Sequence, residues 1–246
     1  MFGEGDVLAG IRPGMRVLDL ATGRGEPALR AAQRVAPDGF VVGVELADGV
    51  LEMAREKARL SGLSNLDLRV ADAASAQDIA SNYFHAATVR WGLMYMAAPV
   101  AALMIVHQAL LPTGVLVAAL WAEPERVPYY TLPRRLLQLY RALPRIEAEA
   151  PGTFRYADLE RVTRDLGRAG FLLDHVEEMD VTVFESETDA ETIDWVRALG
   201  LTQFLNALPE HEQRAWEIDL TSEVRRRRAG LLQLGGVTRI VRARKN

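Results

Sequence analysis

The residues best suited to chemistry form a short glycine turn with a carboxylate on each side. Gly23 and Gly25 stand within residues 22–25, and glycine tolerates positive φ and lets a ligand approach the backbone closely. Asp19 precedes this turn and Glu26 follows it. Carboxylate oxygens accept hydrogen bonds and attract cations. The turn is therefore predicted to bind a small organic ligand that carries donor or cationic groups.

Two elements must hold this turn in place. Residues 17–20 are an apolar run with one carboxylate, which suits a buried strand. From Pro27 to Val35 the apolar residues follow helical spacing, and proline is tolerated in the first turn of a helix. A strand, a glycine turn and a helix N-terminus together form a nucleotide-type binding corner.

The spacing of Gly23, Gly25 and Ala28 also satisfies the dinucleotide pattern G-x-G-x-x-G/A. A pyrophosphate, however, sits on a helix N-terminus and takes hydrogen bonds from its free N–H groups. Here Glu26 adds negative charge at that position and Pro27 has no N–H to donate. A ligand with a ribose and an ammonium or sulfonium group, and without phosphate, fits better. We therefore predict that the ligand is S-adenosylmethionine.

Strands and helices alternate along much of the chain. Beyond the binding corner, strands are predicted at residues 40–44, 66–70, 86–90, 115–120, 176–184 and 237–243, and helices at 48–60, 100–111 and 156–166. This alternation with buried strands favours an α/β fold with a doubly wound, mostly parallel sheet. Glu45, Asp72 and Trp91 each follow a predicted strand, and ligands of such sheets bind outside the carboxyl ends of the strands.

Five motifs in order resemble those of the class I S-adenosylmethionine-dependent methyltransferases. They are Val17-Leu-Asp-Leu-Ala-Thr-Gly-Arg-Gly-Glu-Pro-Ala-Leu, Gly43-Val-Glu-Leu-Ala-Asp-Gly-Val-Leu-Glu-Met-Ala-Arg, Val70-Ala-Asp-Ala, Arg90-Trp-Gly-Leu-Met-Tyr and Leu111-Pro-Thr-Gly. The resemblance is greatest to the branch of ubiquinone and menaquinone biosynthesis methyltransferases and many small-molecule enzymes. It covers residues 14–121, 156–183 and 237–243, and it implies a seven-stranded Rossmann-like methyltransferase fold.

The resemblance also assigns the cofactor site. Asp19 and the turn residues surround the methionine part, Glu45 binds the ribose hydroxyls, and Asp72 binds the adenine amino group. The position of Glu45, 20 residues after Gly25, agrees with a ribose contact. The complete set of predicted cofactor-binding residues is Asp19, Ala21, Thr22, Gly23, Gly25, Glu45, Leu46, Asp72, Ala73, Arg90 and Trp91.

Two positions depart from the family pattern. Ala21 replaces the first glycine of the usual motif, which is expected to crowd the turn slightly. His85 stands where the family often has an aspartate, and at the entrance of a strand it is expected to have no effect on chemistry. Family members also carry more helical sequence before the first strand than residues 1–15 provide. Another segment then covers the cofactor, or the chain is truncated.

Two insertions, residues 122–152 and 188–232, extend the chain beyond a minimal sheet-and-helix core, and the second reads as two or more helices. We expect them to form a cap beside the methyl-transfer site, although packing on the sheet or a dimer contact is the alternative. The predicted acceptor pocket comprises Trp91, Met94, Tyr95, Tyr129, Tyr130 and Arg134.

Composition narrows the function classes. The 246 residues, 49% hydrophobic and 25% charged, predict one domain with insertions. The absence of cysteine excludes disulfides, thiolate nucleophiles and Cys-based metal sites, and the four histidines lack metal-ligand spacing, so no metal is expected. A net charge of −4 provides no overall electrostatic attraction to nucleic acid. Without a signal peptide or membrane-spanning run, a soluble cytoplasmic protein is expected.

The predicted function is methyl transfer from S-adenosylmethionine to a small molecule, yielding S-adenosylhomocysteine. The residues assign no catalytic base, and they leave the acceptor and the oligomeric state open. The alternative is a domain that binds S-adenosylmethionine in a structural or non-methylating role. Nucleic-acid methylation is less favoured, because the Asn/Asp-Pro-Pro-aromatic motif of amino-group methyltransferases is absent and cytosine C5 methylation requires a cysteine.

Overall fold

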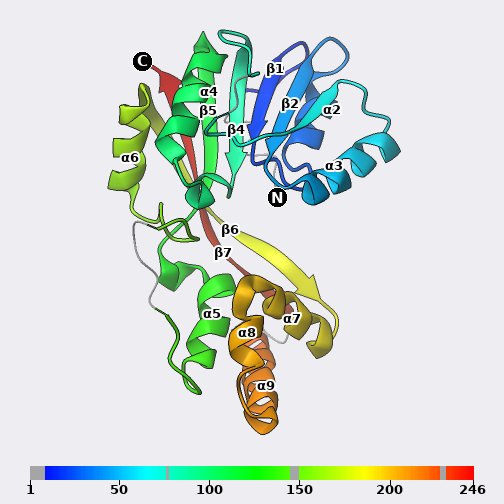
Figure 1. The fold of residues 1–246 in the computed structure, drawn as a ribbon, viewed down its shortest axis with the longest axis vertical. Coiled ribbons are helices and arrows are strands. Elements are labelled where there is room, and N and C mark those ends of the chain that lie inside the picture. The colour runs from blue at the N-terminus through cyan, green and yellow to red at the C-terminus, as the bar shows by residue number, and fades with distance from the viewer. Residues whose placement is uncertain (1–8, 76–77, 145–149, 228–230) are drawn as a thin grey trace. The chain divides into compact units, whose positions relative to one another are not determined.

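The computed structural model describes residues 9–75, 78–144, 150–227 and 231–246 (Figure 1). Its strands form a seven-stranded sheet in the order β3-β2-β1-β4-β5-β7-β6. The chain divides into two compact units. Unit 1 comprises Met1–Leu120, Glu149–Glu178 and Arg239–Asn246, and unit 2 comprises Trp121–Ala148 and Met179–Thr238. The predicted seven-stranded α/β sheet is confirmed.

Parallel strands form the part of the sheet that carries the glycine turn. They are β1 (Arg16–Leu20), β2 (Phe40–Glu45), β3 (Leu66–Val70), β4 (Phe84–Arg90) and β5 (Leu110–Trp121). Leu18 of β1 lies opposite Val42 of β2 on one side and Ala87 of β4 on the other, and both pairings are parallel. All three residues are buried, as expected for central strands that helices cover on both faces. The carboxyl ends of these strands therefore meet at one edge of the sheet.

Helices of unit 1 each bury one face. They are α2 (Ala28–Val35), α3 (Asp48–Leu60), α4 (Pro99–Ala109) and α6 (Leu159–Arg168), with the 3-10 turn η1 (Leu93–Tyr95) before α4. In α2 the buried residues are Ala28, Leu29, Ala31, Ala32 and Val35. This spacing places them on one face, which packs against β1 and β2. Figure 1 shows α2 and α3 beside β1 and β2, and α4 beside β5. Helix α6 contacts α4.

Several helix and strand boundaries differ from prediction, three of them for clear local reasons. The strand expected at 115–120 begins earlier, because Leu110 already pairs with Phe84 and the register then shifts so that Val115 pairs with Ala86. The predicted turn after the preceding helix is thus a bulge within β5, and the helix ends before Leu110. The helix expected at 156–166 starts at Leu159, because the Asp158 side chain caps it by accepting the Glu160 N–H.

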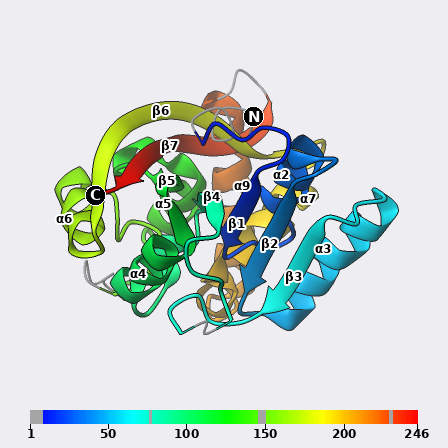
Figure 2. The same cartoon turned by 90° about the horizontal axis from the view of Figure 1, so that it is seen from above.

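The strands β6 (Phe171–Ser186) and β7 (Leu232–Lys245) extend through both units and are longer than predicted. Figure 2 shows them side by side. Arg242 Nε donates to Asp174 Oδ1 at 2.9 Å and Arg239 Nη2 donates to Glu178 Oε1 at 2.9 Å. Residue 174 of β6 thus pairs with residue 242 of β7, and residue 178 with residue 239. Residue numbers rise along β6 as those of their partners fall along β7, so the two strands are antiparallel.

Unit 2 has its own hydrophobic core. It contains η2 (Pro124–Arg126), α5 (Pro128–Leu137), α7 (Asp189–Val196), the π-helical η3 (Arg197–Leu201), α8 (Thr202–Leu205) and α9 (Glu210–Arg227). Trp216 of α9 is fully buried in this core, and its indole N–H donates to the Pro133 carbonyl of α5 at 3.2 Å. The prediction of two or more helices within residues 188–232 is confirmed. Both insertions contribute to unit 2, while the single-domain description of the chain stays a prediction.

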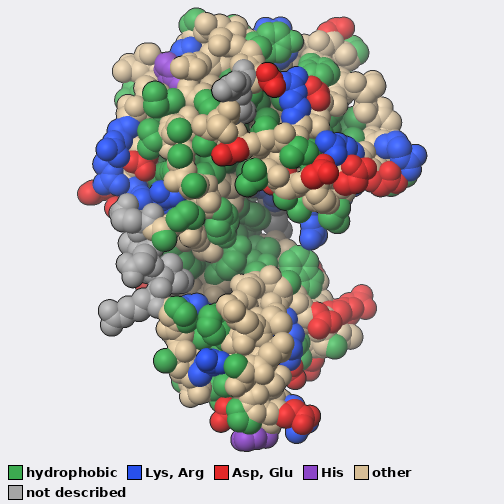
Figure 3. Space-filling view, viewed as in Figure 1, with side chains coloured by type: hydrophobic (Ala, Val, Ile, Leu, Met, Phe, Trp, Pro, Cys, Tyr) green, Lys and Arg blue, Asp and Glu red, His purple; other side chains and the backbone are tan. Residues whose placement is uncertain are grey.

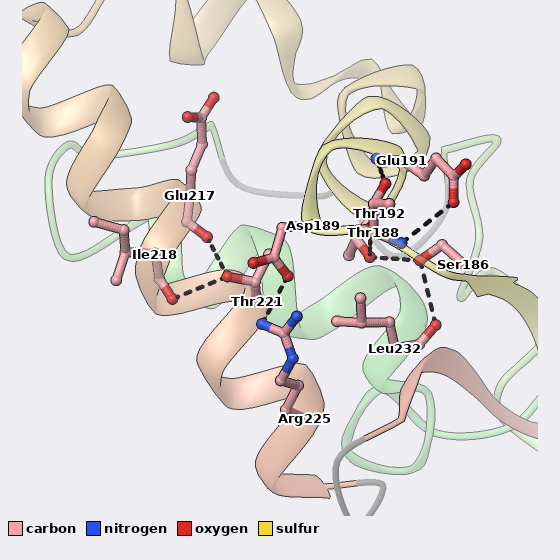
Figure 4. Close-up of polar contacts among 10 residues, drawn as sticks. All are labelled: Ser186, Thr188, Asp189, Glu191, Thr192, Glu217, Ile218, Thr221, Arg225 and Leu232. Carbon is pink, nitrogen blue, oxygen red and sulfur yellow. Dashed lines mark hydrogen bonds and ion pairs between the residues drawn. The ribbon is translucent and has the colours of Figure 1, made fainter.

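Polar contacts fix where α7 begins (Figure 4). Thr188 and Glu191 form a capping box, in which each side chain accepts from the other residue's backbone N–H. Arg225 of α9 pairs with Asp189 at 2.7 Å and so links the two helices. The arginines that follow in α9 pair with Glu223 of the same helix.

Candidate functional site

The glycine turn of unit 1 lies between β1 and α2 in a left-handed backbone conformation. The φ angles are 51° at Ala21, 55° at Gly23 and 97° at Gly25. A Cβ at Gly25 would lie 2.6 Å from Leu29 Cδ1, whereas one at Gly23 would meet only the Ala21 carbonyl oxygen, at 3.9 Å. Gly25 therefore permits close packing of the helix, and Gly23 leaves the backbone open to an approaching group.

Three amide groups of the turn already donate within the protein. The Thr22 N–H donates to the Val44 carbonyl at 3.0 Å, the Gly23 N–H to Glu45 Oε2 at 3.0 Å, and the Gly25 N–H to the Thr22 carbonyl at 2.9 Å. A pyrophosphate needs such groups to be free. These three amides are therefore not free to bind a pyrophosphate, and the exclusion of a dinucleotide stays a prediction.

Asp19, at the end of β1, is fully buried. Its carboxylate accepts from Thr22 Oγ1 at 2.5 Å and from Thr88 Oγ1 of β4 at 2.6 Å. Burial raises the pKa of Asp19 to about 6, although these hydrogen bonds, the Ala28 N–H and the charge of Arg90 all favour the ionised form. Because the carboxylate has no exposed surface, it holds the turn in place and cannot touch a ligand in this conformation. The sequence did not single out Thr88.

Glu45 joins the end of β2 to the glycine turn. Besides the Gly23 amide, its carboxylate accepts from the Leu46 N–H at 2.9 Å and from the Ala47 N–H at 3.0 Å. An ionised carboxylate offers roughly four acceptor positions, so three donors leave capacity for a ligand hydroxyl. The Leu46 side chain is 70% exposed beside it and presents an apolar surface.

The end of β3 is tied to the end of β2, since the Ala71 N–H donates to the Glu45 carbonyl at 2.9 Å. Asp72 follows and caps the next turn by accepting the Ala74 N–H at 2.9 Å, with its side chain exposed. Ala73 is buried. The structure therefore brings the predicted ribose and adenine residues to neighbouring strand ends.

Arg90 and Trp91 stand at the end of β4. The Arg90 guanidinium carbon lies 4.9 Å from the centre of the Trp91 ring, and Arg90 Nε donates to the Glu26 carbonyl at 3.2 Å. Burial lowers the pKa of Arg90, whereas the Asp19 and Glu26 carboxylates raise it. One guanidinium is thus placed between two carboxylates next to the turn.

Ala21 affects the turn more than expected. Its φ of 51° lies in the left-handed region, which is strained for a residue with a Cβ. A Cβ at Gly92 would lie 2.4 Å from the Ala21 Cβ. An alanine at position 21 therefore requires a glycine at position 92. His85 lies where it was predicted, at the amino end of β4, and its Nδ1 accepts from the Arg16 N–H at 3.0 Å.

The predicted acceptor residues of unit 1 differ in exposure. Met94 is fully buried, whereas Tyr95 is 46% exposed and its hydroxyl lies 2.9 Å from Thr153 Oγ1. Trp91 is partly exposed and has φ of 52°. Trp91 and Tyr95 are therefore the members of this group that can reach a ligand in this conformation.

The remaining predicted acceptor residues belong to unit 2. Tyr129 is buried in the core of that unit, and the Tyr130 ring packs edge-on against Trp121 with centroids 5.8 Å apart. Arg134 donates to the Pro144 carbonyl. Because the predicted pocket draws on both units, its composition stays a prediction.

Comparison with known proteins identifies the family. A family model described as a methyltransferase domain matches residues 11–144, which contain the glycine turn and the strand ends described above. This chain belongs to the methyltransferase family. Its motifs resemble those of class I S-adenosylmethionine-dependent methyltransferases of the UbiE type.

Several known proteins resemble this methyltransferase. The ubiquinone/menaquinone biosynthesis C-methyltransferase UbiE of Shewanella sp. (strain W3-18-1) is 32% identical over 133 residues, which cover 54% of this chain and 51% of that protein. The methyltransferase thus spans about half the length of the curated relatives it matches.

Solved structures share its fold. A putative methyltransferase of Bacillus halodurans is similar with a TM-score of 0.64 at 18% identity, covering 99% of this chain and 98% of that one. The Haemonchus contortus phosphoethanolamine N-methyltransferase 2, solved with S-adenosyl-L-methionine, gives a TM-score of 0.57 at 15% identity and covers 99% of this chain and 52% of that one. At these identities the likeness concerns the fold.

Among the described residues, no group of three or more histidine and carboxylate side chains is arranged to hold a metal ion. None of the helices in the described part of the methyltransferase combines the length and apolar character needed to cross a bilayer. On the face viewed in Figure 3, acidic and basic side chains are interspersed.

Proposed function

We propose that this enzyme transfers a methyl group from S-adenosylmethionine directly to a small organic acceptor. The observation that carries the proposal is the composition of the turn at the end of β1: its amides donate within the protein, and carboxylates of Glu26, Glu45 and Asp72 surround it or follow neighbouring strands. Such a corner suits a nucleoside with hydroxyl, amino and cationic groups.

Each part of the cofactor has a proposed partner in unit 1. The remaining acceptor capacity of Glu45 suits the ribose hydroxyls, and the exposed carboxylate of Asp72 suits the adenine amino group. The exposed Leu46 side chain supplies apolar surface for the adenine ring. Asp19 acts indirectly, because its hydrogen bonds with Thr22 and Thr88 position the turn.

The chemistry needs little from the protein beyond alignment. When bound, S-adenosylmethionine supplies a methyl group on a sulfonium, a leaving group that needs no protonation. The residues must then orient the acceptor and exclude water, which is worth on the order of 7–11 kcal/mol when geometry is ideal. A general base is required only for acceptors that must lose a proton, so no residue is assigned that role.

A small acceptor is supported by the relatives and by charge. The similar proteins include a C-methyltransferase named for ubiquinone and menaquinone biosynthesis and a demethylmenaquinone methyltransferase. The net charge of −4 does not favour a polyanionic substrate such as nucleic acid. We therefore include carbon, oxygen and nitrogen nucleophiles of small aromatic compounds among the proposed acceptors.

A turnover assay tests this function. The purified chain is incubated with S-adenosylmethionine and a panel of phenols, quinones and amines, and S-adenosylhomocysteine is measured. We expect product with at least one small acceptor, and a much lower rate for Glu45→Gln. Binding of S-adenosylhomocysteine without turnover on any small acceptor, or turnover on DNA or RNA alone, would contradict the proposal.

A further inference from the structure

The end of α9 in unit 2 is rich in arginine. Residues 225–228 of the sequence are four consecutive arginines, and the structure describes the first three of them. Arg226 and Arg227 both pair with Glu223 of the same helix, at 2.7 Å and 2.9 Å. Arg135 of α5 approaches the same carboxylate at 3.7 Å. Three guanidinium groups from two helices therefore gather around one carboxylate, which leaves an excess of positive charge.

These three residues, Arg135, Arg226 and Arg227, form what we call the arginine patch, and most of its donors face outward. Each guanidinium has several N–H donors, whereas one carboxylate offers roughly four acceptor positions. The Arg226 side chain is 73% exposed even though its Nε and Nη2 donate to Glu223 at 2.8 Å. Glu223 is only 15% exposed, and the hydrogen bond from Arg226 lowers its pKa, so the carboxylate stays ionised beneath the guanidinium groups.

The dipole of α9 accounts for only part of this arrangement. Cations are favoured at the C-terminal end of a helix, and the last turn of α9 holds Arg225, Arg226 and Arg227. Arg225 is already paired with Asp189 of α7 at 2.7 Å (Figure 4). Arg135, however, lies on another helix and still converges on Glu223. The patch therefore extends beyond what the dipole of one helix favours.

An exposed leucine follows the patch in the sequence. Leu231 comes four residues after Arg227 and is 54% exposed. Lipid phosphates accept paired hydrogen bonds from guanidinium groups, and an exposed apolar side chain can enter the boundary between headgroups and acyl chains. A free phosphate or a nucleic acid backbone offers a leucine no apolar surroundings. We propose that the arginine patch and Leu231 bind the surface of an anionic phospholipid membrane.

This binding is local and needs no membrane-spanning helix. Charges farther than about 8 Å are largely screened at physiological salt, so the net charge of −4 on the whole chain does not prevent it. It also requires neither cofactor nor turnover. The inference can therefore succeed or fail independently of the proposed function.

Co-sedimentation with vesicles tests this surface. The full chain is mixed with phosphatidylglycerol vesicles and, separately, with phosphatidylcholine vesicles of the same size. We expect binding to the anionic vesicles only, and it should weaken as salt rises from about 0.05 to about 0.5 M. Arg226→Gln/Arg227→Gln should bind about thirtyfold less tightly, because each arginine near an anionic surface contributes about fivefold to affinity.

A matched double variant separates the patch from overall charge. Arg164→Gln/Arg168→Gln removes the same charge from exposed side chains of α6 and should bind as the wild type does. Absence of wild-type binding to phosphatidylglycerol, equal binding to both lipids, or an equal loss in the two double variants would overturn the inference.

Two further measurements keep the inference falsifiable. Should Arg226→Gln/Arg227→Gln not fold, Leu231→Ser is compared with the wild type: binding about fivefold weaker or more supports insertion of the leucine, and unchanged affinity excludes it. Sedimentation velocity without vesicles examines self-association. A wild-type dimer that is lost in Arg226→Gln/Arg227→Gln would assign the patch to a second copy of the chain and overturn membrane binding.

Discussion

At the scale of single residues, the carboxylates of the site have different environments and therefore different tasks. Asp19 is fully buried and its hydrogen bonds fix the turn. Glu45 is half-buried and divides its acceptor positions between backbone amides and the proposed ribose contact. Asp72 is exposed at the end of β3. The sequence alone does not distinguish the roles of these three carboxylates, because the burial of each depends on residues far along the chain.

Glu45→Ala should weaken S-adenosylhomocysteine binding. Loss of the ribose contacts costs about 1.5–3 kcal/mol of binding free energy, the range for a hydrogen bond to a charged group. The Gly23 amide also loses its acceptor, so the turn is less well held. Calorimetry measures the effect, and Glu56→Ala, on the exposed face of α3, serves as the control. Wild-type affinity in a folded Glu45→Ala protein would remove Glu45 from the site.

Asp19 should make stability depend on pH. Its pKa is about 6 in the folded chain against 3.8 when unperturbed, so the folded state binds the proton more tightly. The stabilisation of the folded state by this proton is complete below about pH 4. It is lost as pH rises through about 6, which lowers the free energy of unfolding by on the order of 3 kcal/mol.

Urea unfolding at several pH values checks the Asp19 prediction. Asp19→Asn cannot ionise, so its free energy of unfolding should fall less than that of the wild type between about pH 4 and 7. Asp72→Asn, which changes an exposed carboxylate, is the control and should follow the wild-type curve. Identical pH dependence in wild type and Asp19→Asn would contradict the assigned pKa.

At the scale of elements, the turns after β1 and β4 fit each other closely. Gly92→Ala would place a Cβ 2.4 Å from that of Ala21. Overpacking of this kind costs about 1–3 kcal/mol of stability. Ala21→Gly removes the opposing Cβ and the left-handed strain, so the double variant should recover most of the loss. Denaturant unfolding of the single and double variants measures this coupling, and an equal penalty in both backgrounds would show that the two turns do not interact.

The backbones of β6 and β7 also approach each other closely, at Gly235 and Val181. A Cβ at Gly235 would lie 1.7 Å from the Val181 carbonyl oxygen, so Gly235→Ala should destabilise the chain by about 3 kcal/mol. Gly49 in α3 has open space around its would-be Cβ. Gly49→Ala should therefore stabilise the chain by about 0.4–1 kcal/mol. Thermal unfolding compares the two variants, and the same sign for both would contradict this reasoning.

Most elements of unit 1 could be predicted because their signals are local. Apolar runs, helical periodicity and turns at glycine and proline identify β1 to β4 and their helices within a few residues. The length of β6 could not, because Glu178 and Asp174 resemble exposed residues until Arg239 and Arg242 are known to lie opposite them. Thr88 was missed for the same reason: its partner Asp19 lies 69 residues away.

At the scale of the whole molecule, the proposed cofactor contacts belong to unit 1, whereas both insertions contribute to unit 2. We therefore predict that Tyr130→Ala or Arg134→Ala changes acceptor affinity or turnover and leaves S-adenosylhomocysteine affinity nearly intact. Steady-state kinetics and calorimetry measure the two effects, with Leu139→Ala, an exposed residue after α5, as the control. Equal loss of both properties, or of neither in folded protein, would exclude these residues from acceptor recognition.

We propose that the turn between β1 and α2 accepts donors and cations and rejects phosphates. The most direct measurement is calorimetric titration of the purified chain with S-adenosylhomocysteine and, separately, with NAD. Because the Thr22, Gly23 and Gly25 amides donate within the protein and Glu26 adds negative charge, we expect saturable binding of S-adenosylhomocysteine and none of NAD. Tight binding of NAD with no binding of S-adenosylhomocysteine would contradict it.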